Sequence, residues 1–234
     1  MGFADLHSHV LPQLDDGSKA LDESLQMLKL LHEMGFDLVC ATPHQKLGTL
    51  NPERTRIDST YEVLRAQSPV ELHLGAENFW DEQFLERCRT HAQPTYTGGK
   101  AFLVEINVQV APPHMAESLF QIRVGGLLPV LAHPERYATF WETPEKLEAI
   151  GRTAALVIDL AALDGAHGAQ QCKAAQRLVL SGIAHAAASD IHSPNDARAV
   201  GAGIAWIKKK LGAGAVRRLL EDNPRTILTG ALPD

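Results

Sequence analysis

The α/β character of this chain is most evident in residues 127–137, which read LLPVLAHPERY. Apolar residues fill positions 127–132, and polar groups with chemical capability follow, beginning at His133 and including Arg136. A short apolar run with a polar end is typical of a buried parallel strand whose carboxyl end faces solvent. Gly125 and Gly126 precede the run and predict the end of an amphipathic helix over 114–124.

The same alternation extends along the whole chain. Apolar runs predict strands near 3–6, 37–42, 70–76, 101–107, 127–132, 154–159 and 184–188. Amphipathic segments predict helices near 20–34, 52–67, 81–88, 114–124, 144–151, 168–181, 197–211 and 213–221. Seven successive strand–helix units with short loops favour a (β/α) barrel, in which functional groups gather at the carboxyl ends of the strands. An open doubly wound sheet is the alternative.

Composition limits the classes of protein to consider. The 234 residues are 45% hydrophobic and 21% charged, which is typical of one globular domain spanning 1–234. The net charge of −6 is opposite to the basic field that nucleic-acid binding requires, and we expect Lys208, Lys209 and Lys210 to form a solvated helix face.

Sequence signals also bear on the cellular compartment. The beginning, MGFADLH, carries no export or lipidation signal, and every apolar run is far shorter than the roughly 20 residues that span a bilayer. The three cysteines are widely spaced and do not form a disulfide framework. We therefore expect a cytoplasmic protein without an integral membrane segment.

Metal-capable side chains follow the predicted strands. Six of the seven strands end in, or carry, such a residue, and one more lies in the loop after the first strand; the candidates are His7, His9, Asp16, His44, Glu77, Glu105, His133, Asp190 and His192. In an extended chain residues i and i+2 point to the same side, so His7 and His9 can reach one pocket, as can Asp190 and His192.

Each of these residues alone is a weak signal, because strand-end carboxylates often cap helices and a single histidine is more often structural. Together they predict a metal site, since so many charged groups at one rim would be destabilising without cations. Mixed imidazole and carboxylate ligands suit Mn²⁺, Fe or Zn²⁺ better than Ca²⁺ or Mg²⁺. A structural role is expected for the remaining histidines, which are His32, His73, His91, His114, His167 and His185.

These residues resemble the PHP (polymerase and histidinol phosphatase) superfamily, and within it the bacterial tyrosine-protein phosphatases of capsule and exopolysaccharide operons. The likeness spans nearly the whole chain. It rests on the motifs His7-Ser8-His9, Asp16, His44, Gly75-Ala76-Glu77, Glu105, His133 with Glu135-Arg136-Tyr137, Ser189-Asp190-Ile191-His192 and Glu221-Asp222-Asn223-Pro224-Arg225.

The resemblance implies a distorted (β/α)7, TIM-like barrel, the PHP fold, holding three divalent cations, of which Mn²⁺ is the first expectation. By similarity His7, His9 and Asp190 hold the first cation, and Glu77 bridges it to the second. Glu105 and His133 complete the second site, and Asp16, His44 and His192 form the third. Arg136 corresponds to a catalytic arginine, and Arg198 falls near the place of a phosphate-contacting arginine, although the loop before it is one residue longer than in the family.

The implied activity is hydrolysis of phosphotyrosine by a metal-activated hydroxide, with a polysaccharide-export tyrosine kinase as the expected partner. Clustered cations lower the pKa of water, and Arg136 would stabilise charge on the phosphoryl oxygens. A cysteine phosphatase is excluded, because the residues six beyond the three cysteines are Lys46, Pro94 and Leu178 rather than arginine. Aromatic residues of the rim loops are candidates to wall the substrate pocket, namely Phe79, Trp80, Tyr137, Phe140 and Trp141.

Three alternatives remain open at the level of sequence. A PHP phosphatase of a small metabolite such as histidinol phosphate would use the same metals. An amidohydrolase also begins with His-x-His, but it usually needs a lysine or carboxylate bridge in mid-barrel, and no lysine ends a predicted strand. A non-enzymatic metal-binding module is the third alternative, although such modules tend to lose ligands, and here every position is filled.

Overall fold

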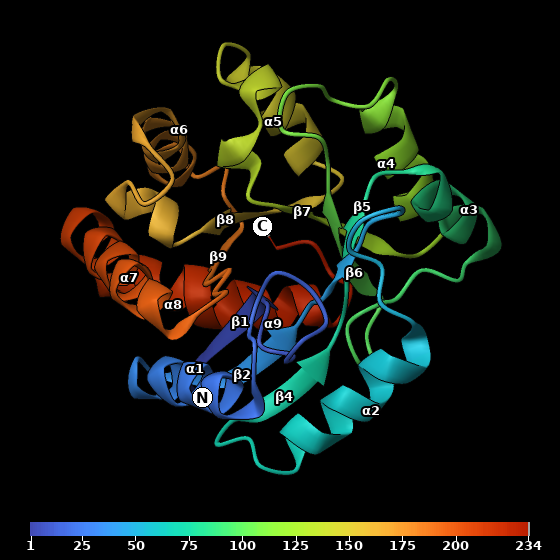
Figure 1. Ribbon diagram of the computed structural model, residues 1–234. Coiled ribbons are helices and arrows are strands. Elements are labelled where there is room, and N and C mark those ends of the chain that lie inside the picture. Colours follow the sequence, from blue (N-terminus) through green and yellow to red (C-terminus); the bar gives the residue numbers. More distant parts are fainter. Residues whose placement is uncertain (234) are drawn as a thin grey trace.

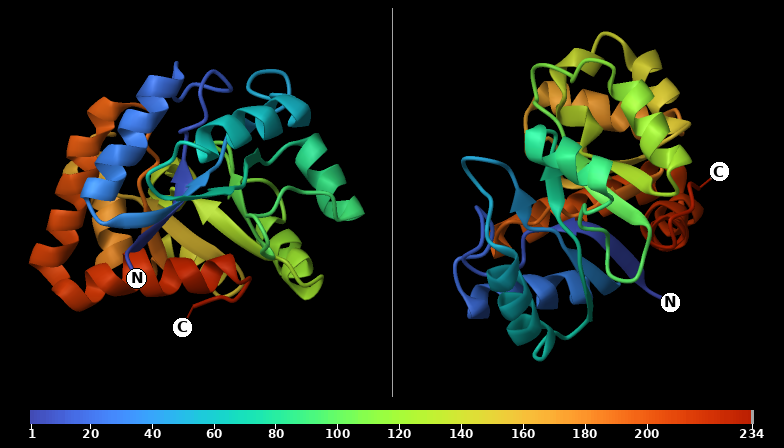
Figure 2. Two further views of the ribbon diagram at one scale, coloured as in Figure 1. Left: turned by 90° about the horizontal axis from the view of Figure 1, so that it is seen from below. Right: turned by 90° about the vertical axis from the view of Figure 1, so that its right-hand side faces the viewer.

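The computed structural model describes residues 1–233, in which helices surround a set of parallel strands (Figures 1 and 2). The strands are β1 (Phe3–Ser8), β2 (Phe36–Ala41), β3 (His44–Gln45), β4 (Glu71–Leu74), β5 (Glu77–Phe79), β6 (Ala101–Glu105), β7 (Leu128–Ala132), β8 (Ala155–Asp159) and β9 (Ala186–Ala188). The helices are α1 (Leu21–Glu33), α2 (Arg54–Arg65), α3 (Glu82–Thr90), α4 (Met115–Val124), α5 (Pro144–Gly151), α6 (Ala169–Leu180), α7 (Ala197–Leu211), α8 (Ala213–Arg217) and α9 (Asn223–Leu228). The α/β fold expected from the sequence is confirmed.

Every strand pairing is parallel, and the strands form two sheets of order β1-β2-β4 and β3-β5-β6-β7-β8-β9. Thr42 and Pro43 separate β2 from β3, and Gly75 and Ala76 separate β4 from β5. Each of these pairs of short strands occupies one strand position, so the seven positions predicted from the apolar runs are all present. The two interruptions carry the chain from one sheet into the other.

The described strands do not close into a continuous barrel, because β1 and β9 meet only at their carboxyl ends. There Ser8 forms an isolated bridge with Ile191, and the backbone N–H of Asp190 donates to the carbonyl of His7 at 2.9 Å. Farther from this rim, α9 lies beside both strands (Figure 1). Asn223 donates to the carbonyl of His185 at 2.6 Å, and Arg225 donates to the carbonyl of Gly2 at 3.1 Å. The barrel is therefore distorted where the C-terminal helix takes the place of strand pairing.

The C-terminal helical segment is longer than the sequence pattern predicts. We expected a helix over 213–221 that stops ahead of Asn223-Pro224, but α8 passes through a π-helical turn at Arg218–Asp222 into α9. Pro224 lies in the first turn of α9, directly after the π-helical turn, so the helical segment accommodates a proline here. The proline therefore marks a junction between helices rather than an end.

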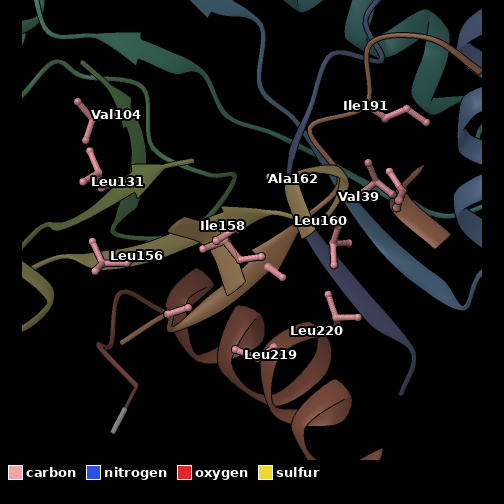
Figure 3. Packing of buried hydrophobic residues seen from close by; sticks show 14 of the residues in the cluster. Val39, Val104, Leu131, Leu156, Ile158, Leu160, Ala162, Ile191, Leu219 and Leu220 are labelled. Carbon is pink, nitrogen blue, oxygen red and sulfur yellow. The ribbon is translucent and has the colours of Figure 1, made fainter. Parts of the chain in front are cut away.

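Two sets of buried apolar side chains follow the alternation of the strands. Val130 on β7 and Val157 on β8 belong to a cluster formed mostly by strand residues. Their neighbours Leu131, Leu156 and Ile158 belong to the larger cluster, which includes side chains from the surrounding helices (Figure 3). Successive residues of a strand face opposite sides, so both faces are packed and the carboxyl ends are held rigidly. Within residues 1–233, no helix combines the length and the apolar character that crossing a membrane requires.

Candidate metal centre

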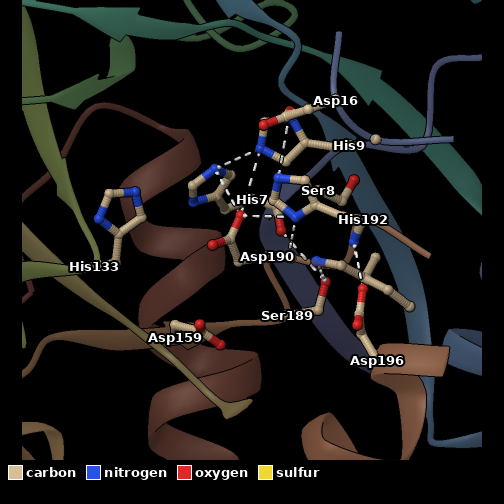
Figure 4. Close-up of polar contacts among 12 residues, drawn as sticks. His7, Ser8, His9, Asp16, His133, Asp159, Ser189, Asp190, His192 and Asp196 are labelled. Carbon is tan, nitrogen blue, oxygen red and sulfur yellow. Dashed lines mark hydrogen bonds and ion pairs between the residues drawn. The ribbon is translucent and has the colours of Figure 1, made fainter. Parts of the chain in front are cut away.

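The candidate ligands meet at the carboxyl ends of the strands. His7 is the penultimate residue of β1, His44 begins β3, Glu77 begins β5, and Glu105 ends β6. His44 is the register partner of Glu77 across the β3–β5 pair, which places two of these side chains on adjacent strands at the same level. Figure 4 shows His7, His9 and His192 gathered around the carboxylate of Asp190.

His7 and His9 form the middle of the cluster. Their Nε2 atoms lie 3.1 Å apart, and the two side chains point to the same side, as the period-two spacing predicts. Nε2 of His7 lies 3.2 Å from Oδ1 of Asp190 and 3.3 Å from Oε2 of Glu77. The corresponding distances from Nε2 of His9 are 3.4 Å and 3.3 Å. Two imidazoles thus face the same two carboxylate oxygens.

Glu77 extends this cluster to three neighbouring side chains. Its Oε2 lies 3.0 Å from Nδ1 of His44, and its Oε1 lies 2.9 Å from Nε2 of His133. Oε2 of Glu105 lies 3.9 Å from Nδ1 of His44. Because Glu77 contacts four histidines, it is the residue best placed to bridge two cations.

A further group forms between the loop after β1 and the loop after β9. Oδ1 of Asp16 lies 3.4 Å from Nε2 of His44 and 3.5 Å from Nε2 of His192. The other nitrogen of His192, Nδ1, bonds the carbonyl of Asp190 at 2.8 Å, so Nε2 is left to face Asp16. His9 belongs to this group as well, and its ring stacks on that of His192 with centroids 4.0 Å apart.

All nine predicted ligands fall into groups whose ligand atoms lie within 4.8 Å of one another. These groups are His9, Asp16, His44 and His192; His7, His133 and Asp190; His7, His9 and Glu77; and His44, Glu77 and Glu105. They overlap the three sets implied by the resemblance without being identical to them, since His133 groups with His7 rather than with Glu105. Shared members such as His7 and Glu77 make this one continuous cluster.

The residues present fit a set of bound cations. Oε2 of Glu77, Oδ1 of Asp190 and Oε2 of Glu105 are buried and lack hydrogen-bond partners within residues 1–233. A buried carboxylate oxygen without a partner is costly, and a cation supplies what is missing. Burial, followed by the charge of Glu77, raises the pKa of Glu105 to about 7 in the absence of a cation. Such a shift marks a group that needs positive charge nearby.

Neighbouring residues hold the candidate ligands in place. Oδ2 of Asp15 lies 2.9 Å from Nδ1 of His9 and also accepts from the backbone N–H of His44 at 3.1 Å. A carboxylate on the far nitrogen of a histidine fixes the tautomer that leaves Nε2 free to bind a metal. Gly17 turns the loop back against His9, where a Cβ would lie 2.2 Å from the carbonyl oxygen of His9.

Two candidate ligands adopt a backbone conformation that is rare for residues other than glycine. His133 has φ of 30° and Asp190 has φ of 48°. Left-handed conformations of this kind are strained, and they concentrate at functional sites, where the surrounding structure imposes them. Asp190 is fixed in part by its backbone hydrogen bond to His7, so the strain serves to aim its side chain at the cluster.

Arg136 lies beside the cluster, in the turn after β7. Its Nη2 donates to Oδ2 of Asp190 and to Oδ2 of Asp159, at 2.5 Å in each case. Burial lowers the pKa of the guanidinium, but Asp190 and Asp159 outweigh this and leave the pKa raised, so the group stays charged. Arg136 lines a cavity of about 240 Å³ together with Asp159, His167, Asp190 and His192.

Arg198 has a different environment. It is exposed near the start of α7 and is not among the residues that line this cavity, although Asp196 and Ala199 are. Two of the rim aromatics are buried and are not among the residues that line this cavity. Tyr137 and Phe140 are buried in the larger apolar cluster, and the hydroxyl of Tyr137 accepts from the backbone N–H of Ile106 at 3.2 Å.

Sequence reasoning missed Asp159 and His167. Asp159 ends the strand predicted over 154–159, so the strand-end rule that selected the candidate ligands pointed to this carboxylate too. No comparable signal marked His167, because it lies in the turn that connects β8 to α6 and reaches Asp159 only in three dimensions.

An α/β fold whose parallel strands converge on histidines and carboxylates defines the class of barrel-like proteins with a candidate metal centre at the carboxyl rim. Residues 3–229 match the family described as "Capsular polysaccharide synthesis, CpsB/CapC". The chain belongs to this family.

Curated relatives carry consistent names. The tyrosine-protein phosphatase CpsB of Streptococcus pneumoniae is 25% identical over 97% of this chain and 99% of its own length. The tyrosine-protein phosphatase YwqE of Bacillus subtilis is 27% identical over 81% of this chain and 77% of its own length. CpsB of Streptococcus agalactiae serotype III is 25% identical, and the match spans 62% of each chain.

Solved structures show the same fold. A chain from the crystal structures of YwqE and of S. pneumoniae CpsB, described as unique metal-dependent tyrosine phosphatases, superposes with a TM-score of 0.87. Its sequence identity is 24%, and the match covers 97% of this chain and 95% of that one. A β-aspartyl dipeptidase from Fervidobacterium islandicum superposes with a TM-score of 0.57 at 12% identity, covering all of this chain and 77% of its own.

Proposed function

We propose that this protein is a metal-dependent protein-tyrosine phosphatase that hydrolyses phosphotyrosine monoesters. The observation that carries the proposal is Arg136, a charged guanidinium bonded to Asp190 at the edge of a histidine and carboxylate cluster. Phosphoryl transfer requires that negative charge on the phosphoryl oxygens be stabilised. The guanidinium of Arg136, held beside a candidate site for several metal ions, is placed to do this. The names of the CpsB and YwqE relatives support the same reading.

Three divalent cations, with Mn²⁺ as the first choice and Fe or Zn²⁺ as alternatives, would be held by the nine clustered side chains. When bound, they would lower the pKa of water to give a hydroxide nucleophile and would reduce the charge repulsion around phosphorus. Glu77 would bridge two of them, since both of its oxygens face histidines.

The residues of the chain contribute orientation and charge. Arg136 would bind the phosphoryl oxygens through its guanidinium, which points from the turn after β7 toward Asp190. Arg198 is proposed as an additional phosphate contact, which would require its exposed side chain to fold toward the cavity. The departing phenolate of tyrosine has a pKa of about 10, so it needs less protonation than an alkoxide does.

The substrate is proposed to be a phosphotyrosine protein, and specifically a tyrosine kinase of polysaccharide export. The capsule-synthesis description of the family and the sequence resemblance support this partner. We place the reaction in the cytoplasm, in keeping with cysteines that are all free.

The experiment compares substrates on one preparation of Mn²⁺-loaded protein. A phosphotyrosine peptide, histidinol phosphate and a β-aspartyl dipeptide are assayed at equal concentration. We expect kcat/KM to be highest for the peptide and hydrolysis of the dipeptide to be absent. A preference for histidinol phosphate would assign a metabolite phosphatase with the same site, and cleavage of the dipeptide alone would assign an amidohydrolase.

A further inference from the structure

His167 and Asp159 form an imidazole–carboxylate pair next to the metal centre. Asp159 is buried, and its Oδ1 accepts from the backbone N–H of Ala161 at 2.7 Å, which fixes the carboxylate. Nε2 of His167 lies in hydrogen-bonding contact with Oδ2. A carboxylate that holds one nitrogen of a histidine orients the ring and leaves the other nitrogen for chemistry. Nδ1 of His167 has no hydrogen-bond partner within residues 1–233.

The pair lies on the outer side of Arg136. Side-chain exposure rises from 2% at Asp190 through 23% at Arg136 to 35% at His167, and all three residues line the same cavity. Nε2 of His167 is 3.0 Å from Nη2 of Arg136. The cavity therefore runs from the candidate metal centre past the guanidinium to an imidazole that faces solvent.

The sequence of candidate metal centre, Arg136 and His167 along the cavity matches the geometry of phosphoryl transfer. The attacking and leaving oxygens lie on opposite sides of phosphorus. A nucleophile formed at the candidate metal centre would therefore send the leaving oxygen outward, toward the exposed part of the cavity. A group that protonates this oxygen has to lie beyond Arg136.

The other titratable groups of the cavity have different partners. Asp190 and His192 belong to the candidate ligand groups. Asp196 accepts from the backbone N–H groups of His192 and Ser193, at 3.0 Å and 2.8 Å, and so caps the following helix. Asp159 is held between Arg136 and His167. His167 is the one remaining titratable side chain among the residues that line the cavity.

We propose that His167 is the general acid of the reaction and that Asp159 is the residue that positions it. The proposal rests on the phosphatase function proposed above. In this step hydroxide forms a new P–O bond, and the ester P–O bond breaks with its electron pair on the leaving oxygen. The proton of Nδ1 passes to that oxygen, and the imidazole regains a proton equal to the one released when water became hydroxide. The products are the free phenol and inorganic phosphate.

The test uses the Mn²⁺-saturated protein and aryl phosphates whose phenols differ in acidity, from 2,4-dinitrophenyl phosphate to phenyl phosphate. A departing dinitrophenolate needs no proton, whereas a departing phenolate benefits from one. We expect His167→Gln to lower kcat/KM for phenyl phosphate by about 10²-fold or more and for dinitrophenyl phosphate by less than about threefold. In His167→Gln, kcat/KM should therefore fall more steeply with increasing pKa of the leaving phenol than it does in the parent protein.

Two further variants complete the design. Asp159→Asn loosens both Arg136 and His167, so it is expected to slow every ester and to slow phenyl phosphate most. His73→Gln removes a histidine whose Nε2 pairs with Glu71 at 2.8 Å on β4, outside the cavity, and leaves both rates unchanged. Because His167 is exposed, His167→Gln should keep the thermal midpoint of the parent protein.

An equal loss on all esters in His167→Gln, or no loss, overturns the general-acid role while the phosphatase function stands. A parent protein that hydrolyses none of the esters overturns both.

Discussion

Arg136 and Asp190 are joined by a hydrogen bond of 2.5 Å from Nη2 to Oδ2. The other oxygen of the same carboxylate, Oδ1, lies 3.2 Å from Nε2 of His7. The side chain of Asp190 thus connects the guanidinium of Arg136 with the centre of the histidine cluster. Any phosphoryl group bound by Arg136 is brought next to the candidate cations, which is the positioning that phosphoryl transfer requires.

Replacing Arg136 by alanine is expected to lower kcat/KM on a phosphotyrosine peptide by about 10²- to 10³-fold, because a preorganised transition-state contact is lost. The number of bound Mn²⁺ ions should not change. Steady-state kinetics and elemental analysis of the same sample measure both quantities. Arg152→Ala is the matched control, since Arg152 is exposed and its one ion-pair partner within residues 1–233 is Glu148 on α5. A loss below about threefold would remove Arg136 from the reaction.

Asp15 is expected to increase metal affinity without coordinating a cation itself, because its carboxylate fixes the ring of His9 through Nδ1. Asp15→Asn should weaken Mn²⁺ binding by about 10- to 100-fold, the usual cost of losing such a partner. Isothermal titration of metal-depleted protein gives the affinity. The exposed Asp164 offers a control in Asp164→Asn. Unchanged affinity in Asp15→Asn would mean that His9 needs no orientation.

Gly17→Ala should weaken metal binding by displacing the backbone of the loop that follows β1. The added Cβ would lie 2.2 Å from the carbonyl oxygen of His9, so the loop that carries Asp16 must move away from the cluster. We expect at least about tenfold weaker Mn²⁺ binding. Gly214→Ala in α8 meets no atom within 4 Å and should raise stability by about 0.5–1 kcal/mol. Equal metal affinity in both variants would contradict the close approach of this loop.

His185 is expected to destabilise the fold in acid. Its Nδ1 accepts from the backbone N–H of Leu156 at 3.0 Å, and burial lowers the pKa of the imidazole. The unfolded chain therefore binds more protons below the usual histidine pKa of about 6.5. This contribution to stability is present above that pH and is lost as the pH falls through the lowered pKa of the folded state.

His185→Asn keeps an acceptor for Leu156 but removes the titration. Urea unfolding at pH 7.5 and pH 5 should show that the parent protein loses more stability than the variant on acidification. The effect of the substitution at a single pH carries no information, because asparagine also changes packing. If the difference between the two proteins is the same at both pH values, His185 does not titrate during unfolding.

The sequence predicts the strand positions and the nine clustered side chains well, because both follow local patterns. His7 and His9 illustrate this, since period two predicts that both side chains point to one side, and in the structure their Nε2 atoms lie 3.1 Å apart. The break between β1 and β9 was not predictable, because it depends on how α9 packs against both strands. His167 was missed for a similar reason: its partner Asp159 is eight residues away across a turn, and no periodicity connects them.

The most direct test of the central claim is a titration of metal-depleted protein with Mn²⁺, in which bound metal and phosphate release from a phosphotyrosine peptide are measured on the same samples. The proposed site predicts no release without metal and activity that rises with bound Mn²⁺ to a limit at three ions per chain. Release that persists in excess chelator, or that never appears with Mn²⁺, Fe or Zn²⁺, would contradict it.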